Sequence, residues 1–275
     1  MKLSQRLIIT VFITILSFTS CQLLPIVNDS IMVVAHRGGA ALELENTIEA
    51  FRNAIMHRVD AIELDVHLSN DGILIVHHDP VVVDTDGKKI AIRELDAAYV
   101  SSLIIGDNQH IPTLREVLTL IKETCNYPLT LFVEIKVDEN KQRYPLIEEK
   151  VLALLDEFSM IKNSLVLSFD FPTLTTIKSL DSEIHTSALI SKTYLKKVGV
   201  NDVGEIIEDL LTLKVSSVGI KDAYISSTLI EALHGEDILV GVWTVNTERQ
   251  MKKFINLNVN FITTDDPVLL MRVLR

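Results

Sequence analysis

Two acidic side chains in the stretch AIELDVHLSNDGILIVHHD, residues 61–79, are the first feature of this sequence that indicates chemistry. Glu63 and Asp65 lie two positions apart in a run that is otherwise typical of a buried strand. Residues two apart in a strand point to the same face. Two carboxylates on one face of a core strand repel each other and are costly to desolvate. The spacing therefore predicts a positively charged partner that stabilises the two carboxylates on this face.

A third carboxylate stands near the end of another apolar run, at Glu134. If it comes from the neighbouring strand, Glu63, Asp65 and Glu134 can surround a divalent cation, which offsets their mutual repulsion. A ligand set made only of oxygens suits Mg²⁺ or Ca²⁺ and does not suit zinc.

Two histidines and two cations belong with this cluster in the predicted layout. His36 and His78 flank the carboxylates, and Arg37 and Lys136 can contact anionic oxygens. A metal and two cations neutralise the charge of a phosphodiester in its transition state. One imidazole can take a proton from the attacking hydroxyl while the other supplies one to the leaving group. His77 is predicted to face away from His78, because adjacent strand residues point to opposite faces.

These residues require elements that bring them to one place. Short apolar runs alternate with amphipathic segments along the chain, and the spacing of the latter indicates helices. The predicted strands are residues 31–36, 61–66, 129–135, 164–169, 184–190, 216–220, 238–245 and 260–264. The predicted helices are residues 46–56, 113–124, 145–158, 171–180, 202–213, 226–235, 247–257 and 266–274. Eight strand–helix pairs in about 250 residues predict an α/β fold, a (β/α)8 TIM barrel.

The chemistry of such a barrel lies at the C-terminal ends of its strands. Besides the residues above, Ser168, Trp243 and Asp265 fall at these ends. We expect Trp243 to form a wall of the substrate pocket. Asp265 either caps the last helix or contacts ligand. Asn46 with Thr47 is typical first of a helix N-terminus, and a contact at the rim is the secondary interpretation. Residues 79–111 interrupt the alternation as a polar insertion after the second strand, next to a further short strand at residues 73–77.

The sequence resembles the glycerophosphodiester phosphodiesterase family. The stretches AHRGGA, ENTIEAF, IELDVHLSNDG, IVHHDP, IPTLREVL, FVEIK, VWTVN and FITTDDP follow one another in the order found in that family, from about residue 32 to residue 270. The resemblance implies a barrel with an insertion after the second strand and cleavage of glycerophosphodiesters to an alcohol and glycerol 3-phosphate. It also implies His36 and His78 as the acid–base pair, with metal carboxylates and phosphate-contacting cations at Glu63, Asp65, Glu134, Arg37 and Lys136.

Some positions depart from the family pattern. Leu44 replaces a usual proline, Ser69 a usual threonine, and Asn260-Phe261 a common Asp-Gly pair. A bulky Phe261 near the rim would alter the pocket for the alcohol, so the departure concerns substrate choice. The alternatives are a phospholipase D-like or lyase enzyme that acts on lysolipids, and a non-catalytic lipoprotein that binds glycerol phosphates. The alcohol, the metal and the oligomeric state stay open.

The first residues predict export. Lys2 and Arg6 precede an apolar run over residues 7–18, which has the length of the apolar core of a secretory signal, and small residues then lead to Cys21. This order resembles a bacterial lipoprotein signal and predicts a signal peptide at residues 1–20, a lipidated Cys21 and a membrane-anchored enzyme domain at residues 26–275. An uncleaved signal anchor and an ordinary secretory signal are the alternatives.

The acidic net charge of the chain argues against a nucleic-acid partner. The full chain has 26 Lys and Arg residues and 37 Asp and Glu residues. Removal of residues 1–20 takes away Lys2 and Arg6, which leaves 24 basic and 37 acidic residues and a net charge of −13. A nucleic-acid partner would require basic patches, so we expect a small-molecule glycerophosphodiester as substrate and no nucleic acid.

Overall fold

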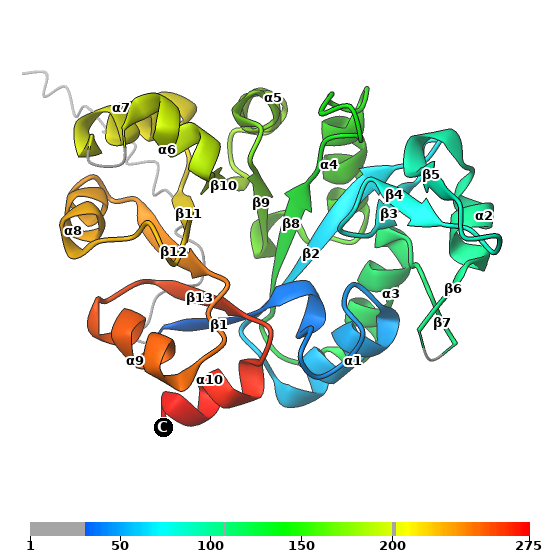
Figure 1. Cartoon of the computed structure of the whole chain (residues 1–275), viewed down its shortest axis with the longest axis horizontal. Helices are drawn as coiled ribbons and strands as arrows, with labels where there is room; N and C mark the ends of the chain where they lie inside the picture. The colour runs from blue at the N-terminus through cyan, green and yellow to red at the C-terminus, as the bar shows by residue number, and fades with distance from the viewer. Residues whose placement is uncertain (1–30, 107, 200–201) are drawn as a thin grey trace, which may run out of the picture.

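Eight parallel strands form a closed barrel in the computed structural model, which describes residues 31–106, 108–199 and 202–275 (Figure 1). The strands follow one another around the barrel in chain order, and β1 pairs with both β13 and β2, which closes the sheet. They are β1 (Met32–Ala35), β2 (Ala61–Leu68), β8 (Thr130–Ile135), β9 (Ser164–Ser168), β10 (His185–Ile190), β11 (Ser217–Lys221), β12 (Leu239–Trp243) and β13 (Phe261–Thr264). The predicted TIM barrel is confirmed.

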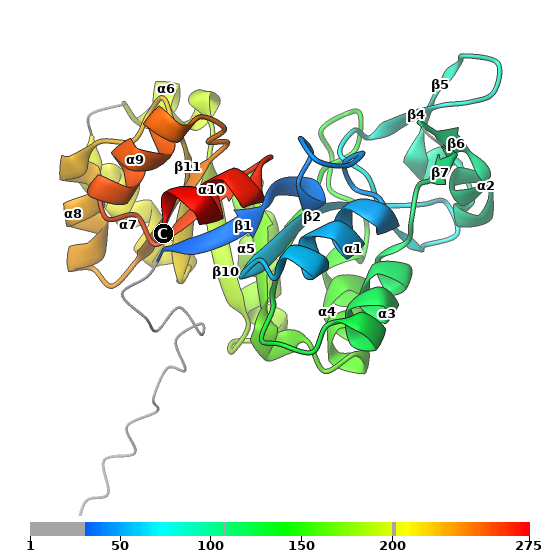
Figure 2. The same ribbon diagram turned by 90° about the horizontal axis from the view of Figure 1, so that it is seen from below.

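Helices follow the strands and cover the outside of the barrel (Figures 1 and 2). Side-chain caps fix where several of them begin. Thr113 and Glu116 form a reciprocal capping box at the start of α3, and Asp170 and Asp266 cap helices that carry a proline in their first turn. The predicted helices are present as α1 (Ile48–His57), α3 (Leu114–Thr124), α4 (Ile147–Glu157), α5 (Phe171–Leu180), α7 (Val203–Leu213), α8 (Ser227–Gly235), α9 (Glu248–Asn256) and α10 (Pro267–Val273). A short helix that was not predicted, α6 (Lys192–Val198), follows β10.

Phe261 lies inside the barrel and not at its rim, so the expectation that it borders the alcohol pocket was wrong. It is the first residue of β13, is 2% exposed, and packs edge-to-face on Phe132 with ring centroids 5.3 Å apart. Gly241 makes room for it, because a Cβ at Gly241 would lie 1.7 Å from the Phe261 ring. Phe261 therefore fills the apolar interior at the end of β13 that lies away from the catalytic rim.

The insertion after β2 is a small folded module and not an irregular polar segment (Figure 2). It starts with β3 (Leu74–Val76), which pairs antiparallel to β2 and confirms the predicted extra strand. The hairpin β4 (Val81–Val83)–β5 (Lys89–Ala91), the helix α2 (Ala97–Ser102) and the hairpin β6 (Ile104–Ile105)–β7 (Gln109–His110) follow. Its own core contains Ile75, Val82, Ile92, Ala97, Val100, Leu103 and Ile111. The apolar side chains of the insertion therefore pack on one another.

The predicted signal peptide at residues 1–20 and the lipidation site Cys21 lie outside the described residues. Over residues 31–106, 108–199 and 202–275, no helix is both long enough and apolar enough to cross a membrane.

Candidate active site

Three carboxylates meet at the C-terminal end of the barrel, as the sequence predicted. Glu63 and Asp65 lie on β2 and Glu134 on β8, where Asp65 and Glu134 are register partners. One carboxylate oxygen from each of the three residues lies within 4.8 Å of the other two. Glu63 is 5% exposed, Asp65 1% and Glu134 8%. An all-carboxylate set of this size fits a divalent cation that prefers oxygen ligands.

Burial makes three negative charges unfavourable here. Burial, and then the charge of Asp65, raise the pKa of Glu63 to about 8. Burial also raises the pKa of Glu134. Burial opposes ionisation of Asp65 as well, but the charges of Lys136 and Arg37 outweigh it and lower its pKa to about 2. Asp65 is thus the carboxylate that neighbouring cations hold ionised, whereas Glu63 favours its neutral form when no further positive charge is present.

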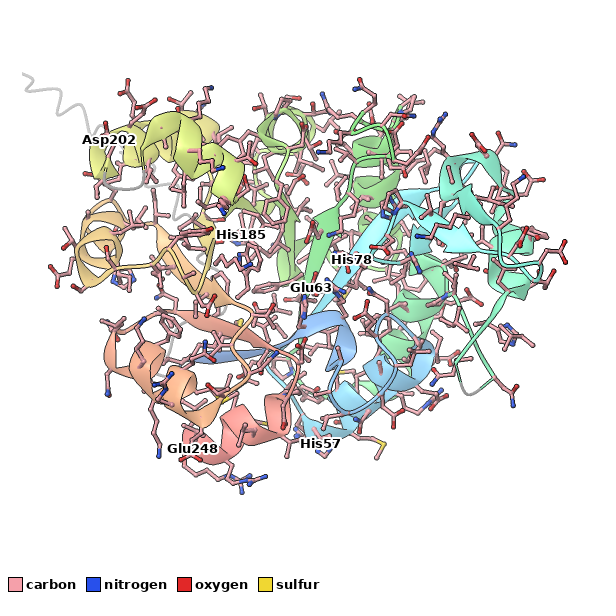
Figure 3. The ribbon with its side chains drawn as sticks, viewed as in Figure 1. His57, Glu63, His78, His185, Asp202 and Glu248 are labelled. Atoms are coloured by element: carbon pink, nitrogen blue, oxygen red, sulfur yellow. The ribbon has the colours of Figure 1, made fainter. Side chains whose placement is uncertain are left out.

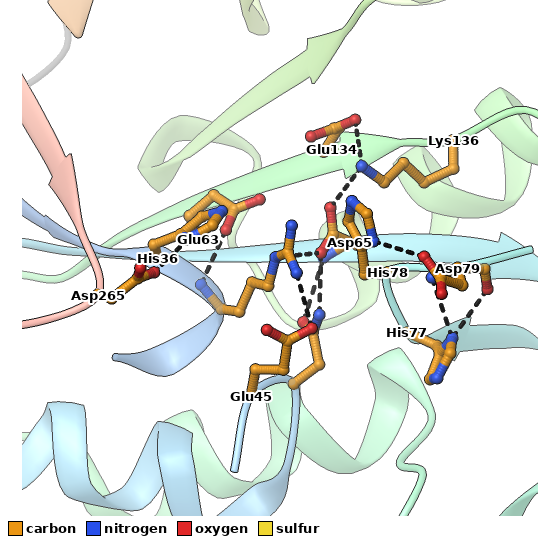
Figure 4. Close-up of polar contacts among 12 residues, drawn as sticks. His36, Glu45, Glu63, Asp65, His77, His78, Asp79, Glu134, Lys136 and Asp265 are labelled. Atoms are coloured by element: carbon orange, nitrogen blue, oxygen red, sulfur yellow. Dashed lines mark hydrogen bonds and ion pairs between the residues drawn. The ribbon is translucent and has the colours of Figure 1, made fainter. Parts of the chain in front are cut away.

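Lys136 borders the cluster (Figure 4), and so does Arg37 through its contacts with Glu63 and Asp65. The Lys136 Nζ donates to Glu134 Oε1 at 2.6 Å and lies 2.9 Å from Asp65 Oδ1. The backbone N–H of Arg37 donates to Glu63 Oε2 at 2.9 Å. The side-chain Nε of Arg37 lies 3.4 Å from Asp65 Oδ2. The structure therefore brings both predicted cations to the carboxylates.

His36 follows β1 and forms a pair with Asp265, which follows β13. The His36 Nδ1 lies 2.5 Å from Asp265 Oδ1, and Asn246 Nδ2 donates to the other oxygen of Asp265. Asp266, and not Asp265, caps α10. Of the two roles that the sequence left open for Asp265, helix capping is therefore excluded, and its contact is with a candidate catalytic histidine.

His78 is the second histidine at this rim, beside Asp65 (Figure 4). Its Nδ1 lies 2.8 Å from Asp79 Oδ1. His77 instead turns to the backbone oxygen of Asp79, 2.8 Å from its Nδ1. Figure 3 shows His78 and Glu63 near the middle of the molecule and His57 at its lower edge on α1. The structure therefore groups His78, and not His77 or His57, with the carboxylates.

Asn46 is a site residue that the sequence indicated only as a secondary possibility. Its Nδ2 donates to Asp65 Oδ2 at 2.9 Å, and it is 3% exposed. Asn46 has a left-handed backbone (φ 56°), which asparagine tolerates well, and its neighbour Thr47 caps α1. The asparagine directly before a helix cap was the available signal, and the sequence placed a contact at the rim second to a role in the helix start.

Trp243 ends β12 on the opposite side of the barrel mouth. Its ring packs edge-to-face on Phe169, with centroids 5.5 Å apart, and Phe169 is 42% exposed. Ser168 is buried and donates to the backbone oxygen of Ile135 at 2.9 Å. Ser168 therefore supports the strand ends, whereas Trp243 and Phe169 form an aromatic surface at the rim.

Comparison with known proteins agrees with this geometry. A model described as the glycerophosphoryl diester phosphodiesterase family matches residues 36–269, from the first candidate histidine into α10. The chain belongs to this family. A glycerophosphodiester phosphodiesterase of Bacillus altitudinis is 31% identical over 245 residues, which cover 86% of this chain and 94% of that protein. A glycerophosphodiester phosphodiesterase of Caldanaerobacter subterraneus is 28% identical over 254 residues, which cover 89% of this chain and 98% of that protein.

Solved structures of the family share the fold. A glycerophosphodiester phosphodiesterase from Thermotoga maritima superposes with a TM-score of 0.70 at 26% identity and covers 89% of this chain and 99% of its own. A phosphodiesterase of Oleispira antarctica in complex with the product sn-glycerol-3-phosphate superposes with a TM-score of 0.71 at 23% identity. The match covers 88% of this chain and 96% of that protein. The predicted family membership is confirmed.

Proposed function

We propose that this protein hydrolyses glycerophosphodiesters to an alcohol and glycerol 3-phosphate. The observation that supports this best is the buried carboxylate cluster with a histidine–aspartate pair on either side, at the catalytic end of a barrel of this family. The product bound in the relative from Oleispira antarctica supports the same substrate class.

Glu63, Asp65 and Glu134 hold Mg²⁺ or Ca²⁺ in this proposal. Arg37 also pairs with Glu45, at 2.7 Å, so Lys136 and Arg37 do not neutralise the three carboxylates when these are ionised. A divalent cation would offset the remaining negative charge, which would otherwise repel an anionic phosphodiester. When bound, the cation polarises a phosphoryl oxygen and offsets the charge that develops there.

His36 and His78 carry the proton transfers. Because Asp265 and Asp79 engage the Nδ1 atoms, both rings keep Nε2 for the substrate. Burial opposes the charge on His36, but the hydrogen bond to Asp265, and then Glu63, raise its pKa. Burial, and then the charge of Lys136, lower the pKa of His78. These directions support His78 as the base that takes a proton from water and His36 as the acid that protonates the departing alcohol oxygen.

Arg37 and Lys136 bind the phosphate, and Trp243 with Phe169 forms the wall next to the alcohol. An oxygen of water forms the new bond to phosphorus while the bond to the alcohol oxygen breaks. The two cations stay paired with carboxylates throughout, so their charges are held in place before substrate arrives, which is the arrangement that stabilises a developing charge most.

The purified protein with glycerophosphocholine, and in parallel with lysophosphatidylcholine, tests the substrate class. We expect glycerol 3-phosphate from the first substrate with Mg²⁺ or Ca²⁺ and no turnover with EDTA. Preference for lysophosphatidylcholine with release of a cyclic phosphate would favour the phospholipase D-like alternative. Binding without turnover of either substrate would favour the non-catalytic alternative.

A substrate with a p-nitrophenyl leaving group tests the two histidine roles. This leaving group needs little protonation, so the His36→Ala variant should recover much of its activity with it, and the His78→Ala variant should not. Recovery of His78→Ala alone would reverse the two roles.

Export with a lipid anchor is proposed from the sequence. Residues 1–20 are the signal peptide in this proposal, and Cys21 is lipidated, which places the enzyme on the outer or periplasmic face of a membrane. The Cys21→Ala variant should leave the membrane fraction and incorporate no labelled palmitate. Normal palmitate incorporation by this variant would contradict the anchor.

A further inference from the structure

His67 is a buried histidine near the active site that the mechanism above does not use. It lies on β2, is 1% exposed, and makes two hydrogen bonds. Its Nε2 lies 3.1 Å from the backbone oxygen of His78, and its Nδ1 lies 2.9 Å from the hydroxyl of Tyr144. A carbonyl oxygen only accepts hydrogen bonds, so Nε2 carries the hydrogen and Nδ1 accepts from the Tyr144 hydroxyl.

This chain of hydrogen bonds joins three separate segments. Tyr144 lies between β8 and α4, His67 lies on a barrel strand, and His78 follows β3. Tyr144 is 4% exposed, and its ring packs edge-to-face on His67 with centroids 5.7 Å apart. Both partners are enclosed, so neither can exchange its hydrogen bond for one to bulk water without a local rearrangement.

The position of the His78 ring depends on its backbone. The side chain is 38% exposed, and its Nδ1 contacts the carboxylate of the adjacent Asp79. A ring held by its sequence neighbour moves with the local backbone. The backbone on either side of the His77–His78 peptide is tied to β2, because the His77 N–H donates to the Asp65 oxygen at 3.1 Å and the His78 oxygen accepts from His67 Nε2 at 3.1 Å.

We propose that His67 and Tyr144 are positioning residues that fix His78 for proton transfer through its backbone carbonyl. The proposal rests on the proposed function, because it assumes that His78 transfers a proton. Neither His67 nor Tyr144 contacts substrate in this proposal. A displacement of about 1 Å at a reacting group can cost about 10²-fold in rate, so the effect should appear in kcat.

Three substitutions separate positioning from general support. Tyr144→Phe removes one hydroxyl, and we expect kcat to fall about 3- to 10-fold. His67→Leu removes both hydrogen bonds and should lower kcat about 10- to 100-fold, with KM and metal affinity within about 2-fold of wild type. His67→Gln keeps a donor and an acceptor and should recover most of the loss. Tyr127→Phe is the matched control, since the Tyr127 hydroxyl donates to the distant Ile55 oxygen, and its kcat should not change.

A double-mutant cycle gives the sharper result. If His67 acts through His78, His67→Leu should not lower kcat further in a His78→Ala background. An equal loss with and without His78, or full activity of His67→Leu, would overturn the proposal. Should His67→Leu fail to fold, Tyr144→Phe in the two backgrounds answers the same question.

Crystal structures of the variants test positioning without turnover. We expect the His78 peptide to be displaced or poorly ordered in His67→Leu and unchanged in Tyr127→Phe. A His78 that superposes on the wild type in His67→Leu would contradict the proposal, whatever the activity. A wild-type protein without phosphodiesterase activity would contradict the proposed function, and these structures would still decide whether His67 fixes His78.

Discussion

The two sides of the barrel mouth differ in what their strands carry, although the alternation along the strands is the same. On β1, β2 and β8 the ends carry ionisable groups, namely His36, Arg37, Glu63, Asp65, Glu134 and Lys136. On β9 to β12 the interior positions carry Leu167, Leu189, Gly219 and Trp243. A cation and a phosphate need concentrated charge, and an adjacent apolar wall strengthens electrostatic interactions by excluding water. In the proposed function, this difference puts the phosphate on the charged side and the alcohol on the apolar side.

The carboxylates of the charged side should show the largest effect. Glu63→Gln, Asp65→Asn and Glu134→Gln each remove a metal ligand, and loss of metal assistance is worth several kcal/mol, so activity should fall at least about 10³-fold. Titration calorimetry should show weaker Mg²⁺ or Ca²⁺ binding. Glu148→Gln is the control, because Glu148 is also buried but lies on α4 and pairs with Arg143, outside the cluster. Full activity after exhaustive chelation would exclude the metal.

The histidines of the same side come next. His36→Ala and His78→Ala should each lower kcat by about 10²- to 10⁴-fold, the usual value of general acid–base assistance. The double variant should be little worse than the poorer single one, because residues that act as a unit are not additive. His77→Ala should keep most activity. A His77 variant as inactive as the His78 variant, with both folded, would overturn the assignment.

The buried charge of this side should also make stability depend on pH and metal. Glu63 has an ordinary pKa of 4.5 in the unfolded chain and about 8 in the folded metal-free protein. Between these values the folded state holds a proton that the unfolded state has lost, so rising pH destabilises the metal-free protein. Bound metal replaces that proton, and the increase in Tm on adding Mg²⁺ should be at least about 2 °C larger at pH 8 than at pH 6. Calorimetry measures this difference, which Glu63→Gln should reduce, while the raised pKa of Glu134 leaves a smaller dependence on pH.

The apolar side should give the smallest effect. Trp243→Leu removes the aromatic contact with Phe169, and contacts of this kind are worth about 0.5–1.5 kcal/mol. We expect KM for glycerophosphocholine to rise about 2- to 10-fold, with metal affinity unchanged. A loss of metal binding in this variant would mean that the two sides are not separate in function.

Local patterns were enough to predict the elements and most of the charged side. Period-2 alternation located β2 and its two carboxylates, and the strand–helix count indicated a barrel whose C-terminal ends carry the chemistry. Glu134, Lys136, His36 and His78 were then placed by their positions at strand ends or by the resemblance. These signals are local because each depends on the spacing within one element.

Contacts between distant segments were decided only by the tertiary structure. Asp265 meets His36 across 229 positions, because β13 closes the barrel against β1. Phe261 lies inside the barrel because Gly241, on the neighbouring strand, leaves room for its ring. By itself the sequence determined which residue types are present, their spacing and the alternation that forms eight strand–helix pairs. Closure of the sheet decided which side chains face one another, because residues far apart in the chain become neighbours only when the first and last strands pair.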